Sequence, residues 1–211
     1  MFGGFRDRRE AGRLLATSLR DYAGRSDVVV LALPRGGVPV AAEVAAALGA
    51  PLDILLVRKL GVPGHEELAM GAIGSGDLNA LNDDVIHTLG VSHEEMSRVV
   101  ERERRELERR EQLYRGDRPS PRVAGNLVIL VDDGLATGAS MLVAIEGVRA
   151  QGAAAVVVAV PVGPLDTCTL LAEKADRVVC YATPKPFGGV GSWYRDFTQI
   201  GDDEVRALLT S

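Results

Sequence analysis

Apolar residues recur along the chain in short continuous runs, separated by longer segments of helical periodicity. Unbroken apolar runs are typical of parallel strands that are buried on both faces. They predict strands at Val28–Leu33, Leu52–Val57, Leu127–Val131, Ala155–Val160 and Arg177–Tyr181, with a shorter one at Leu68–Ile73. Helical periodicity predicts helices at residues 6–20, 38–48, 138–151 and 165–174. The alternation predicts an α/β fold with a doubly wound, mainly parallel β-sheet flanked by helices.

One polar segment, residues 92–114, interrupts this alternation. Ser92 and Glu95 have the spacing of a capping box. Glutamates precede arginines by four residues, a favourable arrangement on a helix, at Glu94–Arg98, Glu101–Arg105 and Glu106–Arg110. We interpret the segment as a solvated helix lying across the domain, because its balanced charges disfavour a nucleic-acid-binding helix. Packing on a second subunit is the alternative.

The length of 211 residues suits one domain that spans the whole chain. We expect a core at about residues 25–182, a helical insertion at about 82–120 and a small C-terminal cap at about 183–211. Few aromatic and many aliphatic residues favour this helix-and-sheet core over a β-sandwich.

The net charge of −5 and the isoelectric point near 5.3 provide no overall basic field for nucleic acid. Cys168 and Cys180 have no spacing that indicates a disulfide framework. The charged N-terminal residues do not resemble a signal peptide, and no apolar stretch has the length of a membrane span. We therefore expect a cytoplasmic protein that binds neither nucleic acid nor membranes.

The strongest candidate site follows the predicted strand Leu127–Val131. Asp132 and Asp133 stand where this strand should end, and a turn of small residues at 136–140 leads into a helix. Ligands of open α/β sheets bind at the carboxyl ends of the strands, and a helix N-terminus there suits a phosphate. Carboxylates beside it can accept from sugar hydroxyls or hold a hard cation. The pattern predicts a sugar phosphate as ligand.

Two further strand ends carry weaker signals. Residues 35–37 place Arg35, Gly36 and Gly37 between a strand and a helix, so that backbone N–H groups and a fixed charge can face an anion. A tight connection would explain this loop equally well. Arg58 and Lys59 add two cations at the next predicted strand end, where simple solvation is the alternative. The glycine-rich residues 61–67 suit a mobile lid.

Together these segments resemble the type I phosphoribosyltransferase family, whose phosphoribosyl-pyrophosphate (PRPP) motif is similar to Val131–Ser140. The resemblance implies that Asp132 and Asp133 bind the ribose hydroxyls and, with Lys59, serve catalysis. It implies a Mg²⁺ cofactor, for which the two aspartates are candidate ligands. The 5′-phosphate would contact Ala136, Thr137, Gly138, Ala139 and Ser140. The pyrophosphate would contact Arg35, Gly36, Gly37, Arg58 and Lys59.

The resemblance does not identify the acceptor. Ala136 occupies the position where the 6-oxopurine enzymes have an acidic residue, so the loop is more similar to that of the adenine enzymes. In the family a cap at this end of the sheet stacks an aromatic ring on the base. Phe187, Trp193 and Tyr194 are the candidates here, with ordinary packing as the alternative.

The implied function is transfer of the phosphoribosyl group from PRPP to a nitrogenous base, with release of pyrophosphate, in nucleotide salvage. The implied partners are these three small molecules and a second copy in a homodimer. Two other functions stay open at this stage. One is a regulator that binds PRPP as a signal, and the other is a hydrolase acting on PRPP or another sugar phosphate.

Overall fold

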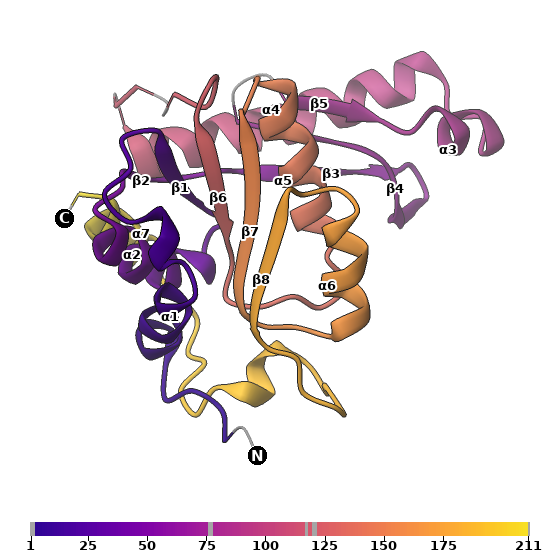
Figure 1. The fold of residues 1–211 in the computed structure, drawn as a ribbon. Coiled ribbons are helices and arrows are strands. Elements are labelled where there is room, and N and C mark those ends of the chain that lie inside the picture. The colour runs from indigo at the N-terminus through magenta and orange to yellow at the C-terminus, as the bar shows by residue number, and fades with distance from the viewer. Residues whose placement is uncertain (1–2, 76–77, 117, 120–121, 211) are drawn as a thin grey trace.

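The computed structural model describes residues 3–75, 78–116, 118–119 and 122–210. Within them, parallel strands form a central sheet in the order β2–β1–β6–β7–β8 (Figure 1). These strands are β1 (Val28–Ala32), β2 (Leu52–Ile54), β6 (Leu127–Val131), β7 (Ala155–Val162) and β8 (Arg177–Ala182). The predicted α/β fold with a mainly parallel sheet is confirmed.

Helices cover both faces of this sheet (Figure 1). One layer contains α1 (Arg8–Thr17), α2 (Gly37–Leu48) and α7 (Asp202–Leu209), and the other contains α5 (Ala139–Ala150) and α6 (Leu165–Ala172). Side chains of alternate residues in each strand pack against the two helical layers. In β6, Ile129 packs in the core beneath the first layer, whereas Leu130 packs beneath the second. Every residue of β6 is buried, which explains its unbroken apolar pattern.

A second, antiparallel sheet lies beside the first. It contains β3 (Val57–Val62), β4 (His65–Gly74) and β5 (Leu78–Leu81), followed by α3 (Asp83–Thr88) and α4 (His93–Arg115). The prediction of one strand over Leu52–Val57 is wrong, because the main-sheet strand ends at Ile54. Leu55 and Leu56 are buried as the chain crosses between the sheets, so the apolar run continues where the strand does not.

The prediction of a helix at 92–114 is confirmed by α4, which begins with the predicted capping box. The predicted ion pairs Glu94–Arg98, Glu101–Arg105 and Glu106–Arg110 are also present. Polar contacts made by residues between Glu103 and Arg115 fix α4 to the domain. They join Glu103 to Arg58, Tyr114 to Asp202 and Arg115 to Asp53.

The C-terminal segment returns to the N-terminus of the chain. The Phe5 amide donates to the Trp193 carbonyl at 2.7 Å, and the Arg195 amide donates to the Phe5 carbonyl at 2.9 Å. Helix α7, which the sequence did not predict, then packs against α2 and α4. The boundaries expected for the insertion and the cap stay predictions. No helix in the described ranges is both long and apolar enough to cross a membrane.

Candidate functional site

The loop between β6 and α5 surrounds a cavity of about 190 Å³, called here the loop cavity. Its lining consists of Asp132, Gly134, Leu135, Ala136, Thr137, Gly138, Ala139, Ser140, Met141 and Val190. The N-cap residue of α5 is Gly138, with φ of 77° and no side-chain cap. The Ala139 amide makes one long hydrogen bond, of 3.5 Å, to Thr137 Oγ1, and the following amide groups of the first helical turn are available to an anion in the cavity. The structure brings all five residues predicted to bind the 5′-phosphate to this one cavity.

The loop between β1 and α2 lies directly against the two aspartates. A Cβ atom added to Gly36 would lie 2.0 Å from Asp133 Oδ2. A Cβ atom added to Gly37 would lie 2.7 Å from the Val131 carbonyl oxygen and 2.9 Å from Asp132 Cα. Only residues without a side chain allow this approach, which holds the predicted pyrophosphate loop beside the acidic pair.

Asp133 is bound by the protein itself through its side chain and its backbone. Its Oδ2 accepts from Arg8 Nε at 2.8 Å, and both side chains are largely buried. Its amide donates to Asp132 Oδ1 at 2.8 Å, and its carbonyl accepts from the Tyr194 hydroxyl at 2.5 Å. Asp133 therefore connects β6 to α1 and to the C-terminal segment.

The two carboxylates differ in their electrostatic surroundings. Burial raises the pKa of Asp132 well above its ordinary value, and the charge of Asp133 raises it further. Burial also raises the pKa of Asp133, but the Arg8 guanidinium opposes the shift. In the described part of the chain no cation forms an ion pair with Asp132, so its carboxylate is the one left to interact with a ligand.

A second cavity of about 100 Å³, called here the arginine cavity, adjoins the first. It is lined by Leu33, Pro34, Leu55, Leu56, Val57, Arg58, Arg110, Asp132 and Ser140. Asp132 and Ser140 line both cavities, so they stand at the junction. The site thus combines a helix N-terminus, a carboxylate and two arginines in adjacent spaces.

The three predicted cations of the pyrophosphate site lie in different environments. The prediction that Arg58 and Lys59 close a strand is wrong, because both lie inside β3 and successive strand residues face opposite sides. Arg58 lines the arginine cavity and donates from Nε to Glu103 at 2.9 Å. Lys59 is exposed, lines neither cavity and donates to the Glu67 carbonyl at 3.3 Å. Arg35 lies 3.6 Å from Asp202 of α7.

Of the aromatic residues predicted to hold a base, Tyr194 is buried and Trp193 is hydrogen-bonded within the protein. The Tyr194 ring is 7% exposed and packs between the rings of Phe5 and Phe197, at centroid distances of 5.3 and 5.1 Å. Trp193 Nε1 donates to the Phe187 carbonyl at 2.8 Å. The residue of this segment that lines the loop cavity is Val190.

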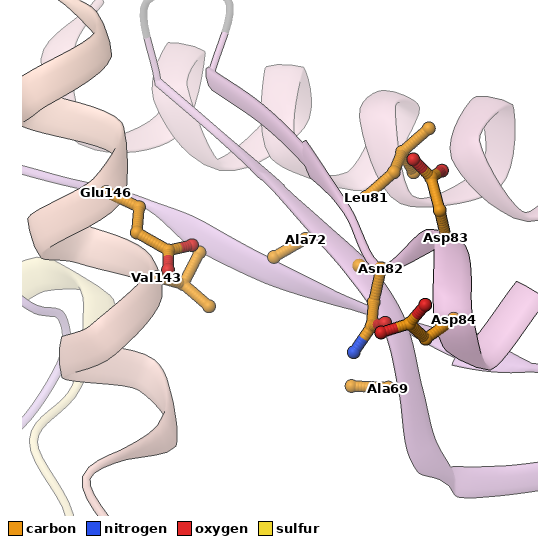
Figure 2. Close-up of a pocket in the computed structure, with 9 residues that line it drawn as sticks. Ala69, Ala72, Leu81, Asn82, Asp83, Asp84, Val143 and Glu146 are labelled. Atoms are coloured by element: carbon orange, nitrogen blue, oxygen red, sulfur yellow. The ribbon is translucent and has the colours of Figure 1, made fainter.

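A larger cavity of about 500 Å³ lies between α5 and the strands β4 and β5. Figure 2 shows Glu146 of α5 on one side of it, with Asn82 and Asp84 on the other. Asp83 is a third carboxylate in the lining. Because these carboxylates oppose a phosphate group, size alone does not make this cavity the anion site.

Sequence reasoning missed two arginines of this site. Arg8 gave no local signal, because its partner Asp133 is 125 positions away in the chain. Arg110 was recognised in the sequence only as the partner of Glu106 on a solvated helix. Its one distinguishing signal is a position on the partly buried side of α4, close to the buried Leu107 and Tyr114.

Comparisons with known proteins agree on one family. The model of the phosphoribosyl transferase domain matches residues 7–185. A protein of Mycobacterium tuberculosis strain H37Rv named "Putative phosphoribosyl transferase" is 51% identical over 205 residues, which are 97% of this chain and 46% of that protein. The chain therefore spans about half the length of this curated relative. The crystal structure of a Thermus thermophilus protein, TT1426, aligns with a TM-score of 0.87 and 44% identity, covering 98% of this chain and 97% of that one.

Proposed function

Because the chain belongs to the phosphoribosyl transferase family, we propose that it transfers the 5-phosphoribosyl group of PRPP to a nitrogenous base and releases pyrophosphate. We propose that this reaction serves nucleotide salvage. The proposal is carried by one observation, the position of Asp132 between the loop cavity and the arginine cavity. A ligand with a phosphate at one end, an anion at the other and hydroxyls between them matches this order of groups.

In the proposed reaction the backbone of residues 136–140 holds the 5′-phosphate, and Asp132 accepts from the ribose hydroxyls. The lone pair of the acceptor nitrogen forms a bond to ribose C1 while the bond from C1 to the pyrophosphate oxygen breaks. Pyrophosphate leaves with that electron pair, and the proton of the acceptor nitrogen passes to water. Arg58 and the backbone of residues 35–37 stabilise the charge that develops on the leaving group.

Of the two aspartates of the site, only Asp132 has a carboxylate that could bind Mg²⁺. In the described residues no group of three or more His, Cys, Asp or Glu side chains could hold a metal ion. Asp133 is already paired with Arg8, which leaves Asp132 as the carboxylate able to contribute an oxygen. We propose that Asp132, together with oxygens of PRPP, would hold Mg²⁺, which would supply charge neutralisation of the pyrophosphate when bound.

The C-terminal segment contains the residues that we propose to bind the acceptor base. Tyr194 supports Asp133 through its hydroxyl, so a base would have to stack on Phe187 or Trp193, whose rings are only partly buried. The absence of an acidic side chain at Ala136 favours a base other than a 6-oxopurine. The homodimer expected from the family resemblance is part of the same proposal.

A panel of acceptors tests the proposed reaction. The protein is incubated with Mg²⁺ and PRPP together with purines, pyrimidines or other amines, and pyrophosphate release is followed. Release that depends on one class of base supports the transferase. Binding of PRPP without release would instead identify a regulator, and release at an equal rate without any base would identify a hydrolase. Asp132→Asn should abolish release, whereas Asp176→Asn, which precedes β8 at the opposite end of the parallel strands, serves as the control.

A further inference from the structure

Two arginines from separate elements line the arginine cavity, and one of them has no place in the family motifs. Arg58 lies on β3, whereas Arg110 lies on α4, outside the three motifs at residues 35–37, 58–59 and 131–140. We propose that Arg110 binds the pyrophosphate group of PRPP and so makes the long helix α4 part of the substrate site. This inference rests on the proposed function and adds a binding residue to it.

The position of Arg110 is fixed by the anchors of its helix. Tyr114, one turn further along α4, donates to Asp202 at 2.6 Å, and Arg115 pairs with Asp53 at 3.3 Å. On the preceding turns, Glu103 binds Arg58. The backbone of α4 beside the cavity is therefore held at both ends, while the Arg110 side chain keeps an exposed fraction of 36%. A planar guanidinium presented in this way suits bidentate contact with a phosphate.

The present partner of Arg110 can release it at low cost. Arg110 Nε donates to Glu106 Oε1 at 2.7 Å. Arg109 binds the same carboxylate through two hydrogen bonds, of 2.8 and 3.0 Å. When Arg110 turns to an anion, Glu106 therefore keeps a bidentate partner. Ion pairs as exposed as this one contribute little to stability, so the exchange favours a multiply charged ligand.

The charges of two arginines, Arg110 and Arg35, act on the Tyr114 hydroxyl. Burial and the bond to Asp202 raise the pKa of Tyr114 to about 12, while the charges of Arg110 and Arg35 act in the opposite direction. Arg35 follows Pro34, which lines the arginine cavity. Cations from β3 and from α4 thus line the cavity that includes Asp132, while Arg35, on the loop after β1, pairs with Asp202.

Arg109 provides a matched control for Arg110. Both side chains are arginines on the same helix turn and both bind Glu106. Arg109 is 61% exposed and lines neither cavity. A substitution at either position removes one positive charge and one partner of Glu106, but only Arg110→Ala removes a guanidinium from the cavity wall.

Calorimetric titration of the full chain with Mg²⁺–PRPP, Mg²⁺–pyrophosphate and ribose 5-phosphate tests the proposal. Arg110→Ala should weaken binding of PRPP and of pyrophosphate about tenfold or more, the loss expected for a charged hydrogen bond. Binding of ribose 5-phosphate, which lacks the pyrophosphate group, should stay within about twofold, as should all three affinities of Arg109→Ala. Arg110→Lys should restore part of the affinity.

Equal affinities of wild type and Arg110→Ala for pyrophosphate would overturn the assignment of Arg110 while leaving the proposed function intact. Equal losses in Arg109→Ala and Arg110→Ala would also overturn it, because they would show a general effect of charge. A wild-type protein that binds no PRPP would overturn the proposed function and this inference together. Thermal unfolding of each variant, expected to match wild type closely, confirms that the comparison is between folded proteins.

Discussion

The pair formed by Arg8 and Asp133 gives the sharpest prediction, because it separates the roles of the two adjacent aspartates. The pair joins α1 to the end of β6, and its side chains are only 9% and 14% exposed. Arg8 also donates to the Thr198 carbonyl at 2.9 Å, and its guanidinium lies 3.9 Å from the centre of the Phe197 ring. We expect Asp133 to act as a structural support, and Asp132 to be the carboxylate that contacts PRPP.

The size of the expected loss of stability follows from the burial of the Arg8–Asp133 ion pair. Removal of one partner from a buried ion pair costs about 3–5 kcal/mol, because the other charge is left without compensation. Arg8→Met should therefore lower the free energy of unfolding by about this amount. For a chain of this length each kcal/mol lowers the melting temperature by roughly 2–4 °C, which gives a decrease of about 6–20 °C. Asp133→Asn should cost less, about 1–3 kcal/mol, because the amide oxygen can still accept from Arg8.

The assay combines chemical denaturation with PRPP titration for five proteins: wild type, Arg8→Met, Asp133→Asn, the Arg8→Met/Asp133→Asn double variant and Asp132→Asn. The double-mutant cycle should give a coupling free energy of about 0.5–3 kcal/mol between the two positions. Asp133→Asn should bind PRPP within about threefold of wild type, whereas Asp132→Asn should lose about tenfold or more. An unchanged stability of Asp133→Asn combined with a loss of PRPP affinity equal to that of Asp132→Asn would refute this division of roles.

Three further variants test other parts of the site. Because the pKa of Asp132 is raised in the folded protein, the folded protein binds the Asp132 proton more tightly than the unfolded chain does. Ionisation of Asp132 therefore lowers the free energy of unfolding as the pH rises from the ordinary pKa of 3.8 through the raised pKa. Asp132→Asn should therefore melt at a higher temperature than wild type at neutral pH, with a difference that disappears in acid; a neutral-pH decrease in metal-free buffer would contradict the assigned shift. Gly37→Ala must displace the backbone at the end of β6 and should abolish PRPP binding, whereas Gly201→Ala, with no atom within 4 Å of the added Cβ, should bind normally. Asp202→Asn should strengthen pyrophosphate binding by less than about fivefold, because it releases Arg35 from a half-exposed ion pair while the amide oxygen can still accept from Tyr114; weaker binding would show that Asp202 positions Arg35 or α4 instead.

The elements that sequence analysis predicted well share a physical property. The strands β1, β6 and β7 lie between two helical layers, so nearly every side chain must be apolar and the pattern is complete. Helix α4 was predicted because its capping box and ion pairs are local interactions, which a sequence displays directly. Residues 136–140 could be grouped as one candidate phosphate loop because they are contiguous in the chain, and they line a single cavity.

The parts that were missed depend on contacts between distant segments. The end of the main-sheet strand at Ile54 cannot be recognised in the sequence, because the next two residues, Leu55 and Leu56, are also apolar and buried. Arg8 becomes part of the site through a carboxylate supplied by another element. The same reason applies to Tyr194, whose sequence context suggested a ring for a base and whose hydroxyl instead supports Asp133.

A crystal structure with Mg²⁺ and a non-reactive PRPP analogue tests the central claim most directly, since that claim concerns the order of groups along the site. We expect the 5′-phosphate on the backbone of residues 136–140, the ribose hydroxyls on Asp132 and the pyrophosphate group in the arginine cavity beside residues 35–37. An analogue bound in the reverse direction, or bound in the acidic cavity between α5 and β4, would contradict it.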